Sequence, residues 1–264
     1  MLKQIGILLL LASHAMAGEL MVHPTRVVFD GNTRTAQIDV INSGAETMTY
    51  RISVIRRRMT ETGEFVTVER AEDGERFADE MIRYSPRQVV VPPGGSQAVR
   101  LQLRKPAALE EGEYRSHLLF QALPPADRAA SAAPSPSGDD LRIELTAVYS
   151  VSIPLIVRHG ATAAEVTIRD VAVRDGAVTF ALDRKGTRSV YGDLIVSLHG
   201  ARGPERVLAR ANGVAVYTPN GSRRVRIPLP PDHSTLAAGE LRVAFAERAE
   251  QQGRVQAESR IARR

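Results

Sequence analysis

The sequence predicts an all-β protein made of two β-sandwiches. Most of the chain alternates apolar and polar residues with a period of two, and turn residues interrupt this alternation about every ten residues. No repeat of fixed period indicates a propeller or solenoid. Helix signals are weak and are confined to residues 76–83. Because one hydrophobic core rarely grows past about 250 residues, the 264-residue chain is expected to form two sandwiches.

The first half of the chain contains five clear strand candidates. They span residues 34–41, 48–55, 89–91, 98–103 and 114–123. In the first of them Ala36, Ile38 and Val40 share one face. The turn residues Asn42-Ser43-Gly44 separate the first two candidates, which predicts that these two form a hairpin.

The second half repeats this pattern with seven candidates. They span residues 166–173, 177–182, 191–198, 206–211, 214–217, 223–229 and 241–246. Asp175-Gly176 lies between the first two and suits the type I′ turn of a hairpin. Asn220-Gly221 indicates another tight reversal.

Residues 1–17 have the pattern of a secretory signal peptide. Lys3 supplies a positive charge, residues 5–12 are apolar, and Ala15-Met16-Ala17 is a small-x-small cleavage site. The apolar run is too short to span a membrane, and no later segment is long enough either, so no membrane insertion is expected. The product is therefore expected to be exported.

The composition argues against most catalytic and metal-binding classes. The chain has no cysteine, which removes disulfides, thiolate metal sites and a cysteine nucleophile. Its six histidines are scattered without the spacing of metal ligands, and no nucleophile elbow, Walker loop or dinucleotide-binding glycine pattern is present. We therefore expect no enzyme activity, no catalytic residue, no metal and no cofactor.

The net charge of +5 does not indicate a nucleic-acid partner. Arg254, Arg260, Arg263 and Arg264 give a basic C-terminus, but acidic residues interleave with them and aromatic residues make up only 5% of the chain. We expect this segment to be a solvated tail and no nucleic acid to bind.

Residues 124–140 (PPADRAASAAPSPSGDD) interrupt the strand pattern. Their composition by itself is typical of an interdomain linker.

The next segment, residues 141–157, is apolar at every odd position. These residues are Leu141, Ile143, Leu145, Ala147, Tyr149, Val151, Ile153, Leu155 and Val157. Such a strand would span about 56 Å, far more than an ordinary strand of five or six residues. Two interpretations remain open: its odd face lines a core throughout, or part of that face is exposed and completes the sheet of another protein.

Four stretches of the chain resemble the PapD-like periplasmic chaperones of the chaperone–usher pathway. They are residues 23–31 (HPTRVVFDG), residues 84–94 (YSPRQVVVPPG) with AVRL at 98–101, residues 113–120 (EYRSHLLF), and the long alternating strand with Arg158. Their order and spacing cover most of residues 20–158. Residues 160–264 fit only as a second sandwich of suitable size.

This resemblance implies two immunoglobulin-like sandwiches at an angle. The expected domains are residues 18–158 and 160–264, with residues 124–140 as a loop of the first domain and residues 141–157 as a donor strand. The implied function is to bind, fold and cap pilus or fimbrial subunits by strand donation and to deliver them to an outer-membrane usher. The implied subunit-binding residues are Leu141, Ile143, Leu145, Ala147, Tyr149 and Val151, and self-capping as a homo-oligomer is a further expectation for the free protein.

By the same resemblance, Arg26 matches the arginine that binds the C-terminal carboxylate of the subunit. The companion lysine of the family is missing, because the matching region reads Ser152-Ile153-Pro154. Either Arg158 or Arg142 takes its place, or Arg26 acts alone. Pro154 lacks an N–H and is expected to mark a stop or bulge in strand pairing.

A secreted adhesive or carbohydrate-binding sandwich is the alternative function. Such modules usually expose aromatic residues on a face or loop, whereas the twelve Phe and Tyr residues lie mostly within strand patterns.

Overall fold

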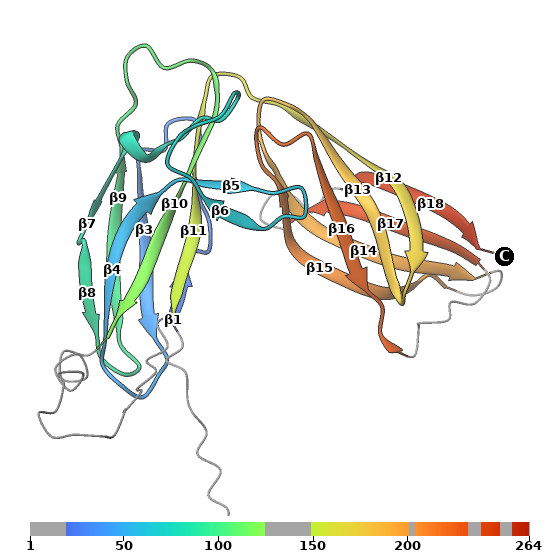
Figure 1. Cartoon of the computed structure of the whole chain (residues 1–264), viewed down its shortest axis with the longest axis horizontal. Coiled ribbons are helices and arrows are strands. Elements are labelled where there is room, and N and C mark those ends of the chain that lie inside the picture. Colours follow the sequence, from blue (N-terminus) through green and yellow to red (C-terminus); the bar gives the residue numbers. More distant parts are fainter. Residues whose placement is uncertain (1–19, 125–148, 201–203, 232–238, 249–254, 264) are drawn as a thin grey trace, which may run out of the picture.

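The computed structural model describes residues 20–124, 149–200, 204–231, 239–248 and 255–263. These ranges form two β-sandwiches that lie at an angle to one another (Figure 1). The predicted all-β architecture of two sandwiches is confirmed. Within the described ranges, no helix is both long and apolar enough to cross a membrane. A 3-10 turn, Asp79–Met81, falls in the segment with weak helix signals.

The first sandwich consists of a four-stranded and a five-stranded sheet. The four-stranded sheet has the order β1 (Leu20–His23), β3 (Thr35–Asn42), β9 (Ser96–Leu103), β7 (Ile82–Ser85). The five-stranded sheet has the order β2 (Val27–Phe29), β11 (Ser150–His159), β10 (Gly112–Leu123), β4 (Met48–Ile55), β8 (Gln88–Val91). The core between them is built from the alternating residues that the sequence singles out, such as Ile38 and Val40.

The predicted hairpin between residues 34–41 and 48–55 is wrong. β3 pairs with β1 and β9, whereas β4 pairs with β10 and β8, so the chain crosses from one sheet to the other. The buried amide of Asn42 holds this crossing, because its Nδ2 donates to the carbonyl oxygens of Glu46 (2.6 Å) and Val91 (2.9 Å). Alternation determines which residues share a face, but not which strand lies alongside.

The second sandwich contains a three-stranded and a four-stranded sheet. The first has the order β12 (Ala164–Arg174), β13 (Ala177–Gly186), β16 (Ser222–Pro228). The second has the order β15 (Arg206–Val216), β14 (Val190–Gly200), β17 (Gly239–Glu247), β18 (Val255–Arg263). The predicted hairpin at Asp175-Gly176 is confirmed: Arg174 pairs with Ala177, and both turn residues have positive φ, 48° and 64°.

Two predictions for the second sandwich need correction. Residues 206–211 and 214–217 are not separate strands, because β15 runs through both and absorbs a register shift near Gly213, whose φ is 70°. The basic C-terminus is not a solvated tail, since β18 pairs with β17 and buries Ala257. Ion pairs from Arg260 to Glu240 and Glu258 balance its charge.

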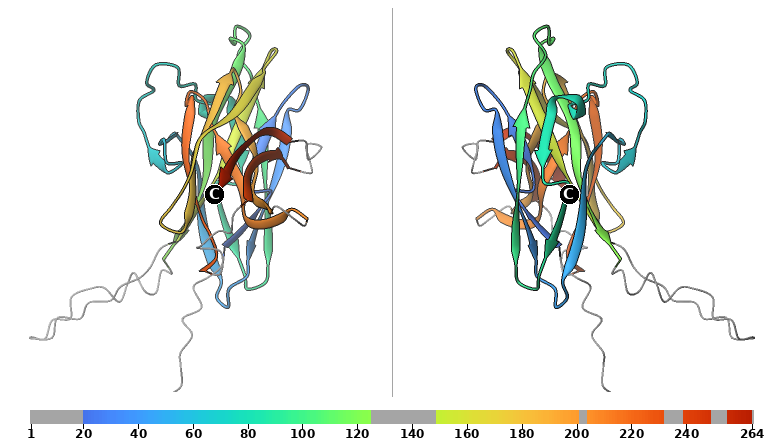
Figure 2. Two further views of the ribbon diagram at one scale, coloured as in Figure 1. Left: turned by 90° about the vertical axis from the view of Figure 1, so that its right-hand side faces the viewer. Right: turned by 90° about the vertical axis from the view of Figure 1, so that its left-hand side faces the viewer.

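A short hairpin of the first sandwich, β5 (Arg57–Met59) and β6 (Phe65–Thr67), reaches across to the second. In the side views the cyan segment that follows β4 projects beyond the sheets (Figure 2). Met59 is only 2% exposed and packs within the apolar cluster of the second sandwich. Asn220 Nδ2 donates to the carbonyl oxygen of Met59 (2.9 Å), and the Arg224 N–H donates to that of Glu61 (2.7 Å). The hairpin therefore joins the two sandwiches.

Pro154 does not interrupt the pairing of β11 with β10, contrary to the expectation from sequence. The register runs from Gln121↔Ser150 to Gly112↔His159 without a shift, and His117 lies opposite Pro154. Parallel pairing with β2 starts only at the next residue, Leu155. The missing N–H therefore falls on the β2 side of the strand, where it removes no ladder hydrogen bond.

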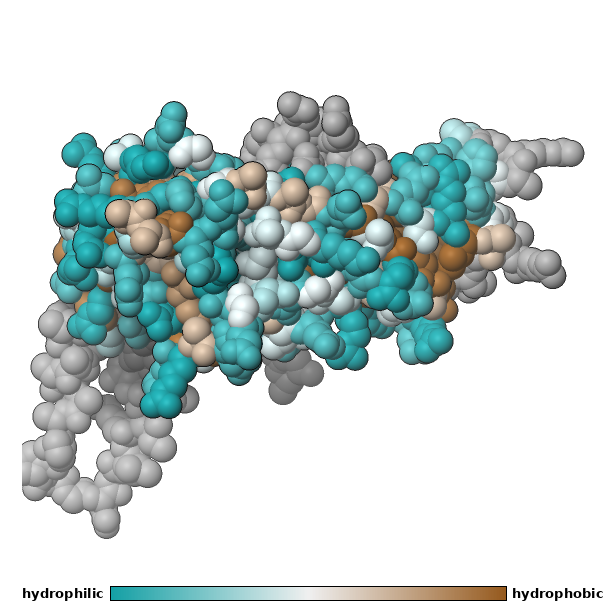
Figure 3. Space-filling view, turned by 90° about the horizontal axis from the view of Figure 1, so that it is seen from above, coloured by the Kyte–Doolittle hydropathy of each residue, from teal (hydrophilic) through white to brown (hydrophobic). Residues whose placement is uncertain are grey.

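The surface seen from above is largely hydrophilic, with separate apolar areas over each sandwich (Figure 3). The exposed large apolar residues in the described ranges are Met21, Val66, Val90, Tyr149 and Val207. Of these, Tyr149 belongs to the predicted donor strand.

Met59→Ala should lower the free energy of unfolding by about 2–5 kcal/mol, because it leaves a cavity in a packed cluster. Urea denaturation of the mature chain measures this loss. Val66→Ala, at a 44% exposed position of the same hairpin, is the matched control and should have a much smaller effect. Equal effects of the two substitutions would show that Met59 does not anchor the hairpin.

Candidate functional site

The candidate site lies on the face of the five-stranded sheet that looks toward the second sandwich. On β10, this face presents Glu113, Arg115 and His117, which alternate with Tyr114, Ser116 and Leu118 on the other face. The register places Glu113 opposite Arg158, Arg115 opposite Ile156, and His117 opposite Pro154 of β11. Ile156 belongs to the apolar cluster of the second sandwich, while Leu155 and Val157 belong to that of the first. β11 therefore contributes to both cores.

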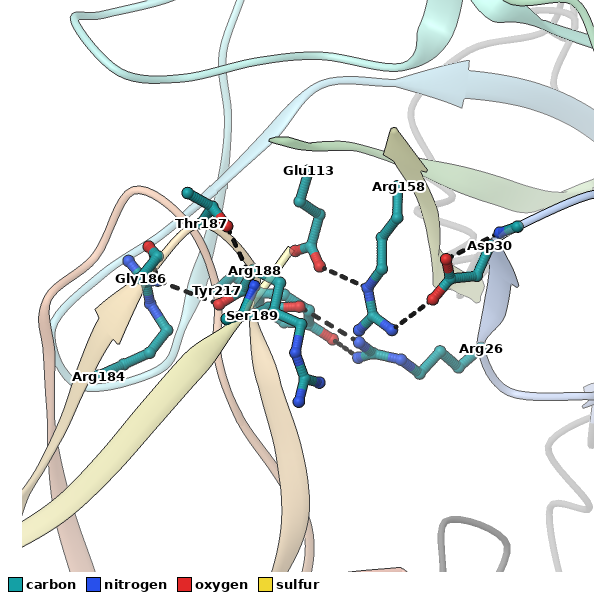
Figure 4. Close-up of polar contacts among 12 residues, drawn as sticks. Arg26, Asp30, Glu113, Arg158, Arg184, Gly186, Thr187, Arg188, Ser189 and Tyr217 are labelled. Atoms are coloured by element: carbon teal, nitrogen blue, oxygen red, sulfur yellow. Dashed lines mark hydrogen bonds and ion pairs between the residues drawn. The ribbon is translucent and has the colours of Figure 1, made fainter. Parts of the chain in front are cut away.

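Arg26 lies directly before β2 and points toward the second sandwich (Figure 4). Its Nη1 donates to the hydroxyl of Tyr217 (2.9 Å) and its Nη2 to that of Ser189 (3.4 Å). Its Cζ lies 4.6 Å from the ring centroid of Tyr191 and 5.3 Å from that of Tyr217. Among the described residues no carboxylate pairs with Arg26, and its Nε is buried without a hydrogen-bond partner.

Arg184 of β13 holds the two loops that carry Ser189 and Tyr217. Its Nη1 donates to the carbonyl oxygens of Gly186 (2.7 Å) and Arg188 (3.0 Å), and its Nε donates to that of Asn220 (3.0 Å). Burial lowers the pKa of Arg184, and the nearby Glu113 opposes this effect. The partners of Arg26 are thus positioned by a buried arginine that binds only backbone oxygens in these contacts.

Arg158 lies beside Arg26 but has acidic partners (Figure 4). Its Nε is 3.2 Å from Glu113 Oε2 and its Nη1 is 3.1 Å from Asp30 Oδ2. The Glu113 side chain is fully buried, so this pair lies in a region of low polarity. Burial raises the pKa of Asp30, but the hydrogen bonds from Arg158 and from the N–H of Gly31 outweigh it and bring the pKa below its ordinary value. Two carboxylates therefore already balance Arg158.

Arg115 is a second unbalanced arginine at the site, and sequence reasoning missed it. It is 4% exposed, its Cζ lies 4.6 Å from the Tyr217 ring centroid and 5.7 Å from that of Phe65, and its Nε and Nη1 have no partner in the described part of the chain. Burial lowers its pKa, while the nearby Tyr217 hydroxyl and the Glu113 and Glu75 carboxylates oppose this effect. A guanidinium stays protonated in proteins, so Arg115 places a positive charge behind the Tyr217 ring.

His117 is buried beside these arginines and packs edge-on against Phe65, with ring centroids 4.8 Å apart. Burial, followed by the charges of Arg115, Arg57 and Arg26, lowers the pKa of His117 to about 3. The imidazole is therefore neutral near pH 7. The signal that could have revealed this site is the i, i+2, i+4 stripe of Glu113, Arg115 and His117 in a strand that is otherwise mostly apolar.

The predicted subunit-binding residues are only partly described. Leu141, Ile143, Leu145 and Ala147 lie outside the described residues, as does Arg142. Tyr149 is 53% exposed, Val151 is half-buried, and Ile153, Leu155 and Val157 are buried in the first core. The odd face of the strand thus passes from exposed to buried along its length.

The edge of β11 is open over part of this length. β2 pairs only with Leu155–Val157, so within the described ranges Ser150–Pro154 pair with β10 on one side and with no strand on the other. Backbone groups at such an edge are able to pair with an added strand.

No group of three or more metal-ligating side chains gathers anywhere in the described part of the chain. The unbalanced charges at the site are cationic, so its chemistry suits an anion.

No protein-family model and no curated protein matches the sequence. Three solved structures are similar over most of their length. The Pseudomonas aeruginosa CupB2 chaperone is 13% identical with a TM-score of 0.44, covering 92% of this chain and 99% of that one. The CsuC–CsuE chaperone–tip adhesion subunit complex from archaic Csu pili of Acinetobacter baumannii is 14% identical with a TM-score of 0.48, and the match covers 92% of this chain and 98% of that one. The class 5 fimbriae chaperone CfaA is 13% identical with a TM-score of 0.46, and the match covers 93% of this chain and 99% of that one. At these identities the similarity concerns the fold alone.

Arg158→Met should cost about 3–5 kcal/mol of unfolding free energy, because it leaves the buried Glu113 carboxylate without its ion pair. Urea denaturation at neutral pH measures the loss. Arg260→Met, which removes a half-exposed arginine from an ion-pair network on β18, should cost about 1 kcal/mol or less. An Arg158 variant no less stable than the Arg260 variant would contradict this role.

His117 should make the protein less stable as the pH falls from 6.5 toward 3. In this window the unfolded chain binds a proton at His117 that the folded chain does not, so unfolding is favoured at low pH and the effect vanishes above pH 6.5. Urea denaturation across this range should show that His117→Leu reduces the slope of unfolding free energy against pH by up to about 1.4 kcal/mol per pH unit. His199→Leu, at an exposed position of β14, is the control. Identical slopes for the parent and the His117 variant would refute the prediction.

Proposed function

We propose that this chain is a periplasmic chaperone that binds, folds and caps pilus or fimbrial subunits and delivers them to an outer-membrane usher. The observation that carries the proposal is the open edge of β11, Ser150–Pro154, which lies next to the exposed Tyr149 and continues the alternating residues 141–149. An alternating strand with a free edge has the form needed to complete the sheet of a partner. The motif resemblance of residues 23–31, 84–101 and 113–120 agrees with this role.

The donated segment would be residues 141–151. Its odd residues present apolar side chains on one face, and its backbone offers hydrogen bonds that do not depend on the partner's sequence. Burial of each large side chain contributes about 1.5–3 kcal/mol. Part of this gain is offset by the loss of translational and rotational freedom and by ordering of the strand. The buried residues Ile153, Leu155 and Val157 keep the other end of the strand in the first core.

Arg26 would bind the C-terminal carboxylate of the subunit. A guanidinium can donate to both carboxylate oxygens, and among the described residues the Arg26 Nη atoms donate only to the neutral hydroxyls of Tyr217 and Ser189. Its charge is therefore available to an anion. Arg158 is less suited to this task, since Glu113 and Asp30 already bind its guanidinium.

The exported location follows from the signal-peptide pattern of residues 1–17, and the first domain would extend from residue 18 to 158 with its loop at 124–140. Free protein would cover its donor strand with that of a second copy. In both subunit capping and self-capping, binding would occur by the addition of a strand to an open sheet edge.

Arg26→Ala should abolish co-purification of a subunit while leaving the fold intact, because the variant loses the carboxylate contact but no core residue. The chain is co-expressed with any small pilin-like gene found beside its own gene, and the subunit recovered with each variant is measured. Arg34→Ala, at an exposed position in the first sandwich, is the matched control and should behave like the parent.

Two outcomes would count against the proposal. If no neighbouring subunit accumulates better with the chain than without it, the chaperone function is wrong. If the Arg26→Ala variant recovers as much subunit as the parent, only the carboxylate anchor is wrong.

A further inference from the structure

A hollow of about 470 Å³ opens beside Arg26, and residues of both sandwiches line it. The lining residues are His23, Pro24, Thr25, Arg26 and Val28 from the start of the first sandwich, with Tyr191 and Arg248 from the second. Two of these side chains are arginines, and none of the described residues that line the hollow is acidic. The hollow is thus the accessible side of the Arg26 site.

Arg248 is held in place at this hollow by the second sandwich. It directly follows β17, which pairs with β14. Glu247, the last residue of β17, lies opposite Gly192, and this register brings Arg248 next to Tyr191. Its Nη1 donates to the Tyr191 hydroxyl (3.1 Å), and its Nε lies 3.4 Å from Asp193 Oδ1. Asp193 is itself fixed, because the same oxygen accepts the N–H of Gly213 (2.8 Å). The Arg248 side chain remains 32% exposed.

Arg26 and Arg248 approach the same aromatic ring. The Cζ atoms of Arg26 and Arg248 lie 4.6 Å and 5.5 Å from the ring centroid of Tyr191. Two guanidinium groups at one ring repel each other, although each is attracted to the π-system. An anion between them would relieve this repulsion.

The local charge balance favours such an anion. Asp193 offsets part of the Arg248 charge, but Arg26 donates to hydroxyls only, and Arg115 adds a buried positive charge behind Tyr217. Arg115 itself is 4% exposed and does not line the hollow, so it acts through its charge and not through contact with a ligand.

We infer that Arg248 supplies the second cation of the carboxylate site, in place of the companion lysine that is missing at Ser152-Ile153-Pro154. Arg26 of the first sandwich and Arg248 of the second would bind one C-terminal carboxylate between them, with Asp193 as the residue that positions Arg248. This inference rests on the proposed function, in which a subunit carboxylate binds at Arg26. It makes recognition of the carboxylate depend on both sandwiches, because each contributes one arginine.

The test compares binding of two fluorescent peptides that differ only at the C-terminus. Both are short peptides of alternating valine and serine; one ends in a free carboxylate and the other in an amide. Fluorescence anisotropy with the mature full chain measures the ratio of their affinities. We expect the parent to prefer the carboxylate form by about tenfold or more.

Arg248→Gln should bring this ratio close to one by weakening only the carboxylate form, and Arg248→Lys should retain part of the preference because it keeps the charge without the planar fork. Arg226→Gln removes the same charge from an exposed position of β16 and should leave the ratio unchanged. The lysine variant keeps the test valid if the glutamine variant does not fold.

The failure of this inference is distinguishable from that of the proposed function. If Arg248→Gln and Arg248→Lys keep the parent's ratio while Arg26→Gln loses it, Arg248 has no role and the anchor at Arg26 stands. If Arg226→Gln lowers the ratio as much as Arg248→Gln, the effect is general electrostatics and the inference is wrong. If the parent does not distinguish the two peptides, both the inference and the carboxylate anchor are wrong.

Discussion

Strand β11 is buried on both of its faces over residues 155–157, and the arrangement of the site depends on this constraint. Leu155 and Val157 pack into the core of the first sandwich, while Ile156, between them, packs into that of the second. The five-stranded sheet therefore has no solvent-facing side where β10 and β11 meet the second sandwich. Charged residues on that side are removed from water, and each must be paired, covered by aromatic rings or balanced by an incoming group.

The charged residues at this interface meet that requirement in different ways. Arg158 has two carboxylate partners, and Arg184 binds backbone oxygens. Arg115 lies against the neighbouring Tyr217 and Phe65 rings, and among the described residues Arg26 donates only to hydroxyls. Unbalanced buried charge lowers stability, and its persistence in one place is typical of a binding site.

The second sandwich does more than cover the first. Tyr217, Ser189, Tyr191 and Arg248 all come from it, and they surround a guanidinium that the first sandwich supplies. The β5–β6 hairpin fixes the contact from the other direction, through Met59. The open edge of β11 lies on the same sheet as Arg26, so a strand added at that edge would run toward the hollow. In the proposed function, strand addition and anion recognition would thus share one surface.

The sequence by itself determined the position of most of the strands, which face of these strands is apolar, and that Asp175-Gly176 closes a hairpin, because these properties depend on neighbours in the chain. It also singled out Arg26 through motif resemblance. It did not determine that residues 34–41 and 48–55 belong to different sheets, since a period of two carries no information about strand neighbours. It also missed β18, whose interleaved charges conceal a strand in which Ala257 is the buried residue among the side chains that the structure describes. The pairing of Arg158, the unbalanced burial of Arg115 and the approach of Arg248 to Arg26 were decided only by the tertiary structure, because each depends on residues that are distant in the chain and meet where the two sandwiches pack together.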